Sequence, residues 1–462
     1  MTEEKELLLF QLGPVQEFIA QAETIGDLRV GSELLSELTA AALEVIPNYE
    51  TEAVFPAVKK GELKGIPNRF LVFVPKGEGE NRAESAAKAA QNKLEEIAKA
   101  CWKGLKNVSG DRYNAYLAQV KSFLQTTWAV LKDPTGNMGA DYKTIGKLMA
   151  MRRNTRAFDA WHEEASASVK DFLSGKEAAL DVVNNNDDNK NSGRGAMNLI
   201  KTARTTQNDL DVANGLGKYI AVIAMDGDHM GGKLSSFSTQ DQHRLFSEKL
   251  ADFARQVKIE PEDGVLIYAG GDDVLAVVKA TRAFEIARKL AKQFTETVSE
   301  DGVTASAGIA IGSCKAPLQD LIHEARAAES RAKHGYGRNA LAVSVLKRSG
   351  EILKWGCKWD NDAAFDIYNR LTEQSGKLSR FAYKLAGFLE PYALKKGDLD
   401  DEKMRKVVLK EALHTLKQTE GAGDALSEEC LKKYLNAPSV ISNPGDFLGL
   451  FMCEAFINRP RD

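Results

Sequence analysis

The chain has 462 residues, a formal net charge of −3, 43% hydrophobic residues and 27% charged residues. This length exceeds one ordinary hydrophobic core and predicts roughly three or four domains. The composition is that of a globular protein. The near-neutral charge excludes a protein that binds nucleic acid through its overall positive charge, although a local basic patch stays open.

Cysteine usage and the N-terminal residues indicate where the chain works. The five cysteines are scattered and include no C-x-x-C pair, which predicts a reducing, cytoplasmic setting without disulfides or a cysteine-rich zinc site. The acidic segment Thr2–Glu6 lacks the basic region of a signal peptide, and no apolar run is long enough to span a membrane. The cysteines are Cys101, Cys314, Cys357, Cys430 and Cys453.

Residues 1–132 predict a first β-α-β-β-α-β unit, the split ferredoxin-like arrangement. Its four expected strands cover 7–12, 53–55, 70–74 and 125–131, and its helices cover 15–43 and 83–105. Helical spacing in the first helix predicts a buried face. The residues of that face are Phe18, Ile19, Leu34, Leu35 and Leu38.

Residues 133–215 follow a turn cluster and predict a mainly helical middle domain. The segment Asn184–Gly195 is polar and low in complexity, so it predicts a mobile loop. The basic cluster Arg152–Arg156 could contact RNA, but exposed helical arginines are common and the alternative stays open.

Residues 216–347 predict a second β-α-β-β-α-β unit followed by one more helix and strand. Expected strands cover 218–225, 264–269, 274–278, 304–311 and 341–345, and helices cover 239–257, 282–298 and 318–333. In the helix 239–257, the residues Leu245, Leu250 and Phe253 are expected to face inward. Residues 348–462 read as a C-terminal helical bundle. The predicted fold class is therefore α+β, with two ferredoxin-like domains, a helical middle domain and a helical bundle.

The segment Gly270-Gly-Asp-Asp273 joins two expected antiparallel strands. Glycines permit a tight hairpin and a close approach of a ligand to the backbone. Adjacent aspartates repel each other unless a cation is present. Turns favour Gly and Asp in any case, so the hairpin alone leaves a purely structural interpretation open.

The first strand of the same unit favours a metal site. It ends in Met225-Asp226-Gly-Asp-His-Met-Gly-Gly232, and its first carboxylate could converge with Asp272 and Asp273. Two Mg²⁺ or Mn²⁺ ions held by such carboxylates could activate a ribose hydroxyl and steady a leaving pyrophosphate. Gly231 and Gly232 could offer amide donors to a triphosphate, while Asp228 could instead cap the following helix. His229 is more readily a packing or solvent-facing residue than an acid or base.

A basic, glycine-rich segment follows at Ala332-Lys-His-Gly-Tyr-Gly-Arg-Asn339. Lys333 could present its ammonium group to a phosphate. The alternative is a helix end in which positive charge complements the helix dipole and Gly335 stops the helix. Because the segment follows Gly-Gly-Asp-Asp in one unit, we favour phosphate contact.

Taken together, these motifs resemble the palm fold of nucleotide cyclases, and most closely the large palm-domain (CRISPR polymerase) subunit of type III-B CRISPR RNA-guided effector complexes. The resemblance extends from Gly13 to about Gly350. It rests on the acidic segments above and on Ser306-Ala-Gly308. It also rests on Gly13–Ile19, Asp27–Ser36, Ile66–Phe70 and Leu346–Gly350.

This resemblance implies that ATP is converted into 3′–5′ cyclic oligoadenylates when the complex binds target RNA through its guide RNA. Asp272 and Asp273 would be the catalytic pair and would bind metal together with Asp226. Nucleotide would contact Gly231, Gly232, Gly270, Gly271, Ser306 and Lys333, and Ser32 of the first palm would help hold a second ATP. Implied partners are other type III-B subunits, including a small helical subunit and a neighbouring repeat-associated RNA-binding subunit.

The sequence departs from the family pattern at three places. The chain opens on the first palm strand and contains no His-Asp dipeptide, so no HD nuclease activity is expected. Lys170–Gly175 stands where many relatives have a cysteine zinc motif, so no structural zinc is expected there. Arg29 occupies a position where relatives often have Trp.

Three alternatives share some of these features. A stand-alone cyclic dinucleotide synthase would use the same metal centre but needs neither the first palm nor the C-terminal bundle. A catalytically silent scaffold of an RNA-guided complex gains nothing from clustered carboxylates. Template-directed polymerisation also shares the centre.

Overall fold

The structure is a computed structural model that describes residues 4–59, 61, 63–105, 108–155, 169–185, 190–373, 379–419 and 426–458. The chain forms two compact units. Unit 1 comprises Met1–Gly215, His229–Val274 and Glu296–Val303. Unit 2 comprises Leu216–Asp228, Leu275–Thr295 and Thr304–Asp462.

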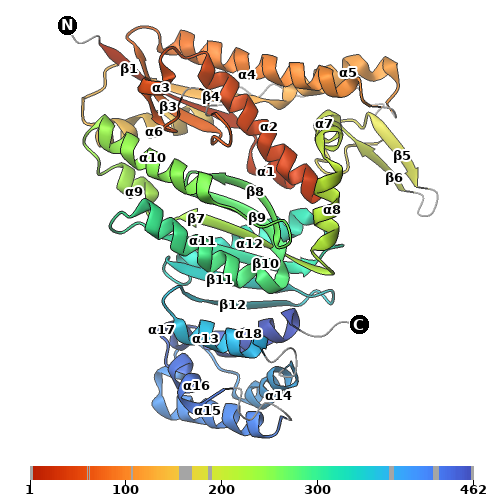
Figure 1. Ribbon diagram of the computed structural model, residues 1–462, viewed down its shortest axis with the longest axis vertical. Helices are drawn as coiled ribbons and strands as arrows, with labels where there is room; N and C mark the ends of the chain where they lie inside the picture. The colour runs from red at the N-terminus through yellow and green to blue at the C-terminus, as the bar shows by residue number, and fades with distance from the viewer. Residues whose placement is uncertain are drawn as a thin grey trace. The chain divides into compact units, whose positions relative to one another are not determined.

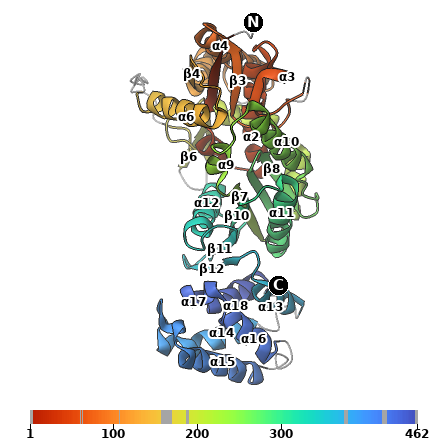
Figure 2. The same ribbon diagram turned by 90° about the vertical axis from the view of Figure 1, so that its left-hand side faces the viewer.

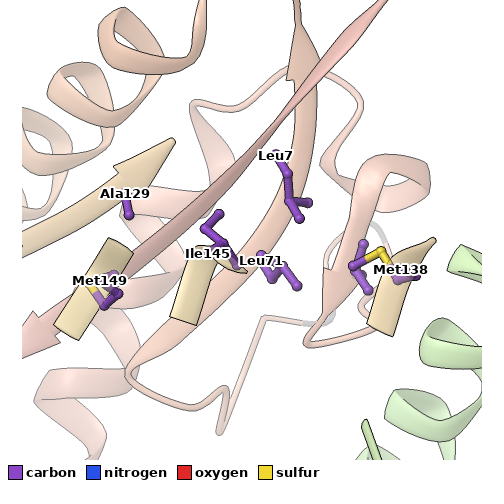
Figure 3. Close-up of a cluster of buried hydrophobic side chains, with 7 residues drawn as sticks. Leu7, Leu71, Ala129, Met138, Ile145 and Met149 are labelled. Carbon is purple, nitrogen blue, oxygen red and sulfur yellow. The ribbon is translucent and has the colours of Figure 1, made fainter. Parts of the chain in front are cut away.

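Unit 1 contains a four-stranded antiparallel sheet with the order β2-β3-β1-β4. Strands β1, β3 and β4 of this sheet are labelled in Figure 1. The central strand β1 is apolar because both of its faces are covered, so that alternate side chains enter opposite cores. Leu7 packs with residues of α6, as Figure 3 shows, whereas Leu8 and Phe10 are fully buried at alternating positions of the strand. The strands are β1 Lys5–Gly13, β2 Ala53–Phe55, β3 Arg69–Pro75 and β4 Gln125–Leu131.

The region 15–43, expected to be one helix, forms two helices, because the helix is interrupted after Ala20. The Thr24 hydroxyl accepts a hydrogen bond from the Asp27 amide, and the Asp27 carboxylate accepts one from the Thr24 amide, so a capping box starts α2. The five side chains predicted to face inward are all buried. The helices up to residue 154 are α1 Gln16–Ala20, α2 Ile25–Glu44, α3 Tyr49–Glu52, α4 Gly79–Trp102, η1 Gly110–Arg112, α5 Tyr113–Phe123 and α6 Met138–Asn154.

The polar segment expected to be a loop contains a hairpin. Strands β5 Asp181–Asn185 and β6 Lys190–Arg194 pair with each other, and residues 186–189 of the expected loop lie outside the described residues. The preceding turn is organised by the buried carboxylate of Asp171, which accepts hydrogen bonds from the amides of Ser174 and Gly195. Unit 1 continues with α7 Ala196–Arg204, α8 Gln207–Gly215, α9 Met230–Leu234, α10 Gln240–Gln256 and β8 Gly264–Gly270.

The larger sheet has the strand order β12-β11-β10-β7-β9-β8. Its first four strands in chain order, β7 to β10, follow the same order as β1 to β4 of the smaller sheet, which confirms the expectation of two ferredoxin-like sheets. The remaining elements of this sheet and its helices are β7 Tyr219–Gly227, β9 Asp273–Lys279, η2 Ala280–Arg282, α11 Ala283–Val298, β10 Ala305–Ser313, α12 Leu318–His334, β11 Ala340–Leu346 and β12 Ile352–Lys358.

The C-terminal region begins with a strand, not with the expected helix, since β12 pairs with β11. The following helices gather beside β12, and α17 and α18 contact it (Figures 1 and 2). The prediction for Leu245 was also wrong, because this side chain is 56% exposed while its neighbour Phe246 is buried. The helices are α13 Asp362–Glu373, α14 Ser379–Leu389, η3 Glu390–Tyr392, η4 Asp398–Asp400, α15 Glu402–Lys417, α16 Glu428–Leu435, α17 Pro438–Ser442 and α18 Gly445–Ile457.

None of the helices in the part of the chain that the structure describes is long and apolar enough to cross a membrane.

Candidate nucleotidyl-transfer site

The end of β7 places Asp226 opposite Ser306 in the antiparallel pairing with β10. The Asp226 carboxylate forms an ion pair with the ammonium group of Lys333, which also lies 2.9 Å from Glu329. Burial lowers the pKa of Lys333, but the hydrogen bonds and charges of Asp226 and Glu329 outweigh it and raise the pKa above its ordinary value. Lys333 is therefore a cation held at the carboxyl end of β7.

A glycine on β10 brings Lys333 to this position. A Cβ atom added at Gly308 would lie 2.1 Å from both the carbonyl oxygen of Ala325 and the amide nitrogen of Glu329 in α12. Only glycine allows the helix backbone to lie this close to the strand. The close packing places the last turn of α12, with Glu329 and Lys333, beside β7 and β10.

Asp228 is the best-connected side chain of this region, and it does not cap a helix. Its carboxylate is fully buried and accepts hydrogen bonds from the hydroxyls of Ser306, at 2.9 Å, and Thr304, at 2.8 Å. It also accepts one from the backbone amide of Asn339 at 2.9 Å. The helix α9 that follows has His229 as its N-cap residue and no side-chain cap. Asp228 thus fastens β7, β10 and the segment after α12 together.

Ser306 was predicted to contact nucleotide, and its location is now defined. The side chain is fully buried and its hydroxyl donates to Asp228. The Ser306 hydroxyl is therefore hydrogen-bonded within the protein, and its contact with nucleotide stays a prediction.

The acidic hairpin is formed by β8 and β9, with Gly271 and Asp272 at the turn. Gly271 has a φ of +70°, a conformation that favours glycine. The Tyr268 hydroxyl donates a hydrogen bond of 3.0 Å to the Asp273 carboxylate, which orients this carboxylate. The sequence pattern therefore predicted the hairpin correctly.

Gly231 and Gly232 lie exposed in the short helix α9. In unit 1, Lys233 of the same helix forms an ion pair of 2.8 Å with Glu300, and Lys249 forms another of 2.7 Å. Hydrogen bonds from the two lysines lower the pKa of Glu300, so the carboxylate stays ionised and holds α9.

Unit 1 contains a cavity of about 1560 Å³. It is lined by residues of the first palm, including Ser32 of α2, and by the hairpin residues Gly270 and Asp273. Three of the predicted site residues therefore meet at one cavity. Its volume exceeds the roughly 300–1,000 Å³ of ordinary small-molecule pockets, which leaves room for more than one nucleotide.

Arg29, which departs from the family pattern, lines the same cavity and links two helices. Its guanidinium donates two hydrogen bonds, of 2.7 and 2.8 Å, to the Asp209 carboxylate in α8. The hydrogen bond from Arg29 lowers the pKa of Asp209 to about 2, and the same contact raises the pKa of Arg29. This ion pair fixes one wall of the cavity.

The predicted metal ligands have the right donor chemistry for hard divalent cations. Asp226, Asp272 and Asp273 offer carboxylate oxygens, and Asp226 already holds a cation in the form of Lys333. Among the described residues, no group of three or more His, Cys, Asp or Glu side chains forms a ready-made metal site. The donors fit Mg²⁺ or Mn²⁺ bound jointly by carboxylates and substrate phosphates, which is the usual mode for Mg²⁺.

Comparison with protein families gives two matches. Residues 219–342 match the family model described as Cas10/Cmr2, second palm domain, and residues 7–99 match that of the CRISPR-associated protein Cmr2, N-terminal. The fold and the first match define a palm-domain protein of the nucleotidyltransferase-like type. With the second match, the chain is similar to Cas10/Cmr2 proteins in both its N-terminal region and its second palm domain.

Individual relatives agree with this assignment. The CRISPR system Cmr subunit Cmr2 of Pyrococcus furiosus is 34% identical over 202 residues, covering 36% of this chain and 23% of that protein. The chain thus matches about a quarter of the length of this curated relative. Among solved structures, a Csm1–Csm4 cassette in complex with pppApA has a TM-score of 0.58 at 14% identity, covering 99% of this chain and 70% of that chain. Csm1 of T. onnurineus has a TM-score of 0.55 at 15% identity, covering 97% and 69%.

Proposed function

We propose that the protein is the palm-domain subunit of a type III-B CRISPR effector complex and converts ATP into 3′–5′ cyclic oligoadenylates when target RNA binds. The observation that carries the proposal is the large cavity lined by both Ser32 of the first palm and Asp273 of the acidic hairpin. Joining two nucleotides requires both to be held at one site, and this cavity has the volume for them.

Solved relatives support the choice of adenine nucleotides. Csm1–Csm4 cassettes have been solved in complex with cA4, with pppApA and with AMPPNP. Those ligands are a cyclic product, a linear intermediate and an ATP analogue for the reaction proposed here. The same cassettes support the proposal that this chain works beside other type III subunits. Guide RNA and target RNA are further partners that we propose for the complex.

The chain's own residues would divide the work in the following way. Two bound Mg²⁺ or Mn²⁺ ions would lower the pKa of a ribose 3′-hydroxyl and neutralise the charge of the leaving pyrophosphate. Asp226, Asp272 and Asp273 would hold these ions, with Asp273 oriented by Tyr268. Gly270 and Gly271 would let the triphosphate approach the hairpin backbone, and Gly231 and Gly232 would contribute amide donors.

Lys333 would then bind phosphate oxygens in place of its present carboxylate partners. Ser32 would position the second ATP in the first palm, which supplies no acidic hairpin of its own.

We further propose four domains, 1–132, 133–215, 216–347 and 348–462. The last would bind a small helical subunit of the complex.

The proposal is tested by mass spectrometry of the products that the assembled complex makes from nucleotides. ATP with target RNA should give cyclic oligoadenylates, and mixed NTPs with an added template should still give adenylate-only products. Cyclic di-GMP made from GTP by the purified chain alone would support a stand-alone cyclase instead. No product under any condition would favour the silent scaffold.

A further inference from the structure

The segment Gly335–Asn339, which directly follows Lys333, is fastened from three sides within unit 2. Asp228 accepts a hydrogen bond from the Asn339 amide at 2.9 Å. The Lys358 ammonium of β12 donates to the carbonyl oxygens of Gly337, at 2.7 Å, and Arg338, at 2.5 Å. The Tyr336 hydroxyl donates to both carboxylate oxygens of Asp446 in α18, at 2.8 and 2.9 Å.

The backbone conformation of this segment is unfavourable without these hydrogen bonds. Arg338 and Asn339 have φ values of +63° and +46°, in the left-handed region that non-glycine residues rarely adopt. Such a conformation is energetically unfavourable and persists only where the surroundings enforce it. The segment between Lys333 and β11 is therefore held in place by its partners and not by its own preference.

Tyr336 reaches Asp446 because β12 makes room for its ring. A Cβ atom at Gly356 would lie 2.4 Å from Cε2 of Tyr336, so the ring lies directly on the strand backbone. The same ring packs on a small cluster of alanines, among them Ala332, the residue before Lys333. The position of the Tyr336 ring is thus coupled mechanically to the last turn of α12.

We infer that Asp446 and Tyr336 form a positioning pair through which the C-terminal helical bundle sets the placement of Lys333. The inference rests on the proposed function, in which Lys333 binds the phosphates of ATP. Neither residue touches substrate. The pair acts on ATP through the fastened segment, and a partner that moves α18 would change nucleotide binding in the palm.

The chain offers a matched control in a second buried tyrosine. Tyr434 also donates its hydroxyl to Asp446, but to the backbone carbonyl oxygen at 2.7 Å, and it accepts from the Trp355 indole at 2.9 Å. Y336F and Y434F each delete one hydroxyl that contacts the same residue. Only the first deletion releases the segment after Lys333, whereas the second also leaves the buried Trp355 indole N–H unpaired and costs at least as much stability.

The two variants are compared in full-length chain and in the assembled complex. Y336F should raise the KM for ATP by roughly two- to tenfold, the value of one hydrogen bond, and should speed backbone amide exchange at 335–339. Y434F should lower the melting temperature at least as much while leaving both the KM and this exchange unchanged. D446A should reproduce the effects of Y336F, and the double variant should add nothing to them.

An unchanged exchange rate at 335–339 in Y336F would overturn the inference, as would equal KM shifts in Y336F and Y434F. The exchange measurement needs no activity. If the wild-type complex makes no oligoadenylate but exchange responds as expected, the proposed function fails and the mechanical link stands. If the wild type is active and Y336F matches it in both measurements, the link fails alone.

Discussion

The first strands of the two sheets occupy the same topological place but end differently. β1 ends in neutral groups, and its Leu12 carbonyl accepts a hydrogen bond from the side-chain amide of Asn68. β7 ends in Asp226 and Gly227, and Asp228 follows directly. Lys333 is bonded to Asp226, and three donors are bonded to Asp228. The corresponding strand end is therefore neutral in the smaller sheet and charged and hydrogen-bonded in the larger sheet.

The connections between the second and third strands of the two sheets differ in length. In the first sheet, 13 residues, numbers 56–68, separate β2 from β3, whereas two residues, Gly271 and Asp272, separate β8 from β9. The short hairpin between β8 and β9 restricts the positions of its carboxylates. The long connection between β2 and β3 instead forms part of the cavity wall, where Leu63–Asn68 line the cavity. The two sheets therefore share one strand order, and the acidic hairpin and the charged strand end both belong to the second sheet.

The largest expected effect comes from removing the hairpin acids. D272A/D273A should lower ATP turnover by at least about a hundredfold, because metal-ion stabilisation of the transition state contributes several kcal/mol. Product formation is measured in the assembled complex, with RNA binding as the control for assembly. Turnover at the wild-type level would remove the hairpin from the chemistry.

Replacing Lys333 tests the charged end of β7. K333A should weaken ATP binding about tenfold or more, as expected for a lost charge-assisted contact. K347A is a control on the same unit, since Lys347 pairs with Glu351 in a connecting turn. ATP affinity measured by titration calorimetry should separate the two, and equal affinities would contradict the assigned role of Lys333.

Two buried ionisable groups should give the units opposite pH dependences. In unit 1, burial lowers the pKa of Lys201 to about 7, while its ammonium is bonded to the backbone carbonyls of Phe18 and Gln21. Between pH 7 and 10.5 the unfolded chain binds more protons at this residue, so stability should rise with pH, by at most about 1.4 kcal/mol per unit. In unit 2, burial raises the pKa of Asp446 to about 7, so stability should fall as pH rises from about 4 to 7.

Denaturant unfolding of K201M and D446N checks these signs against the wild type. K201M should flatten the dependence between pH 7 and 8.5. D446N should flatten it between pH 4 and 7 only in part, because burial also raises the pKa of Glu454 to about 7. Identical slopes in variant and wild type would show that the group does not titrate as described.

The smallest effect is expected in the first palm. S32A should raise the KM for ATP by roughly two- to fivefold, the cost of one hydrogen bond, and leave kcat nearly unchanged. S36A, on the same cavity wall one helical turn away, serves as the comparison. A hundredfold loss of kcat in S32A would mean that the first palm takes part in the chemistry.

Local patterns were sufficient to predict much of this molecule. The apolar runs identified every strand of the two larger sheets except β12, and Gly-Gly-Asp-Asp identified the hairpin. The signal for the break before α2 was also present, as Thr24 and Asp27 have capping-box spacing. β12 was missed because its alternating Ile352-Leu-Lys-Trp355 pattern precedes a long helical region and resembles its start.

The hydrogen-bonded centre could not be predicted, because its members come from distant parts of the chain. Asp228 meets Thr304, Ser306 and Asn339, which are 76 to 111 residues away. Tyr336 meets Asp446 110 residues away. Spacing within one element carries no information about such contacts, which depend on strand order and on the close approaches at Gly308 and Gly356.

The most direct test of the central claim is mass spectrometry of the products that the assembled complex makes from ATP. Three samples suffice: wild type with target RNA, wild type without it, and D272A/D273A with it. We predict cyclic oligoadenylates in the first sample and at most traces in the other two. Equal amounts in all three, or products other than adenylates in the first, would contradict the account.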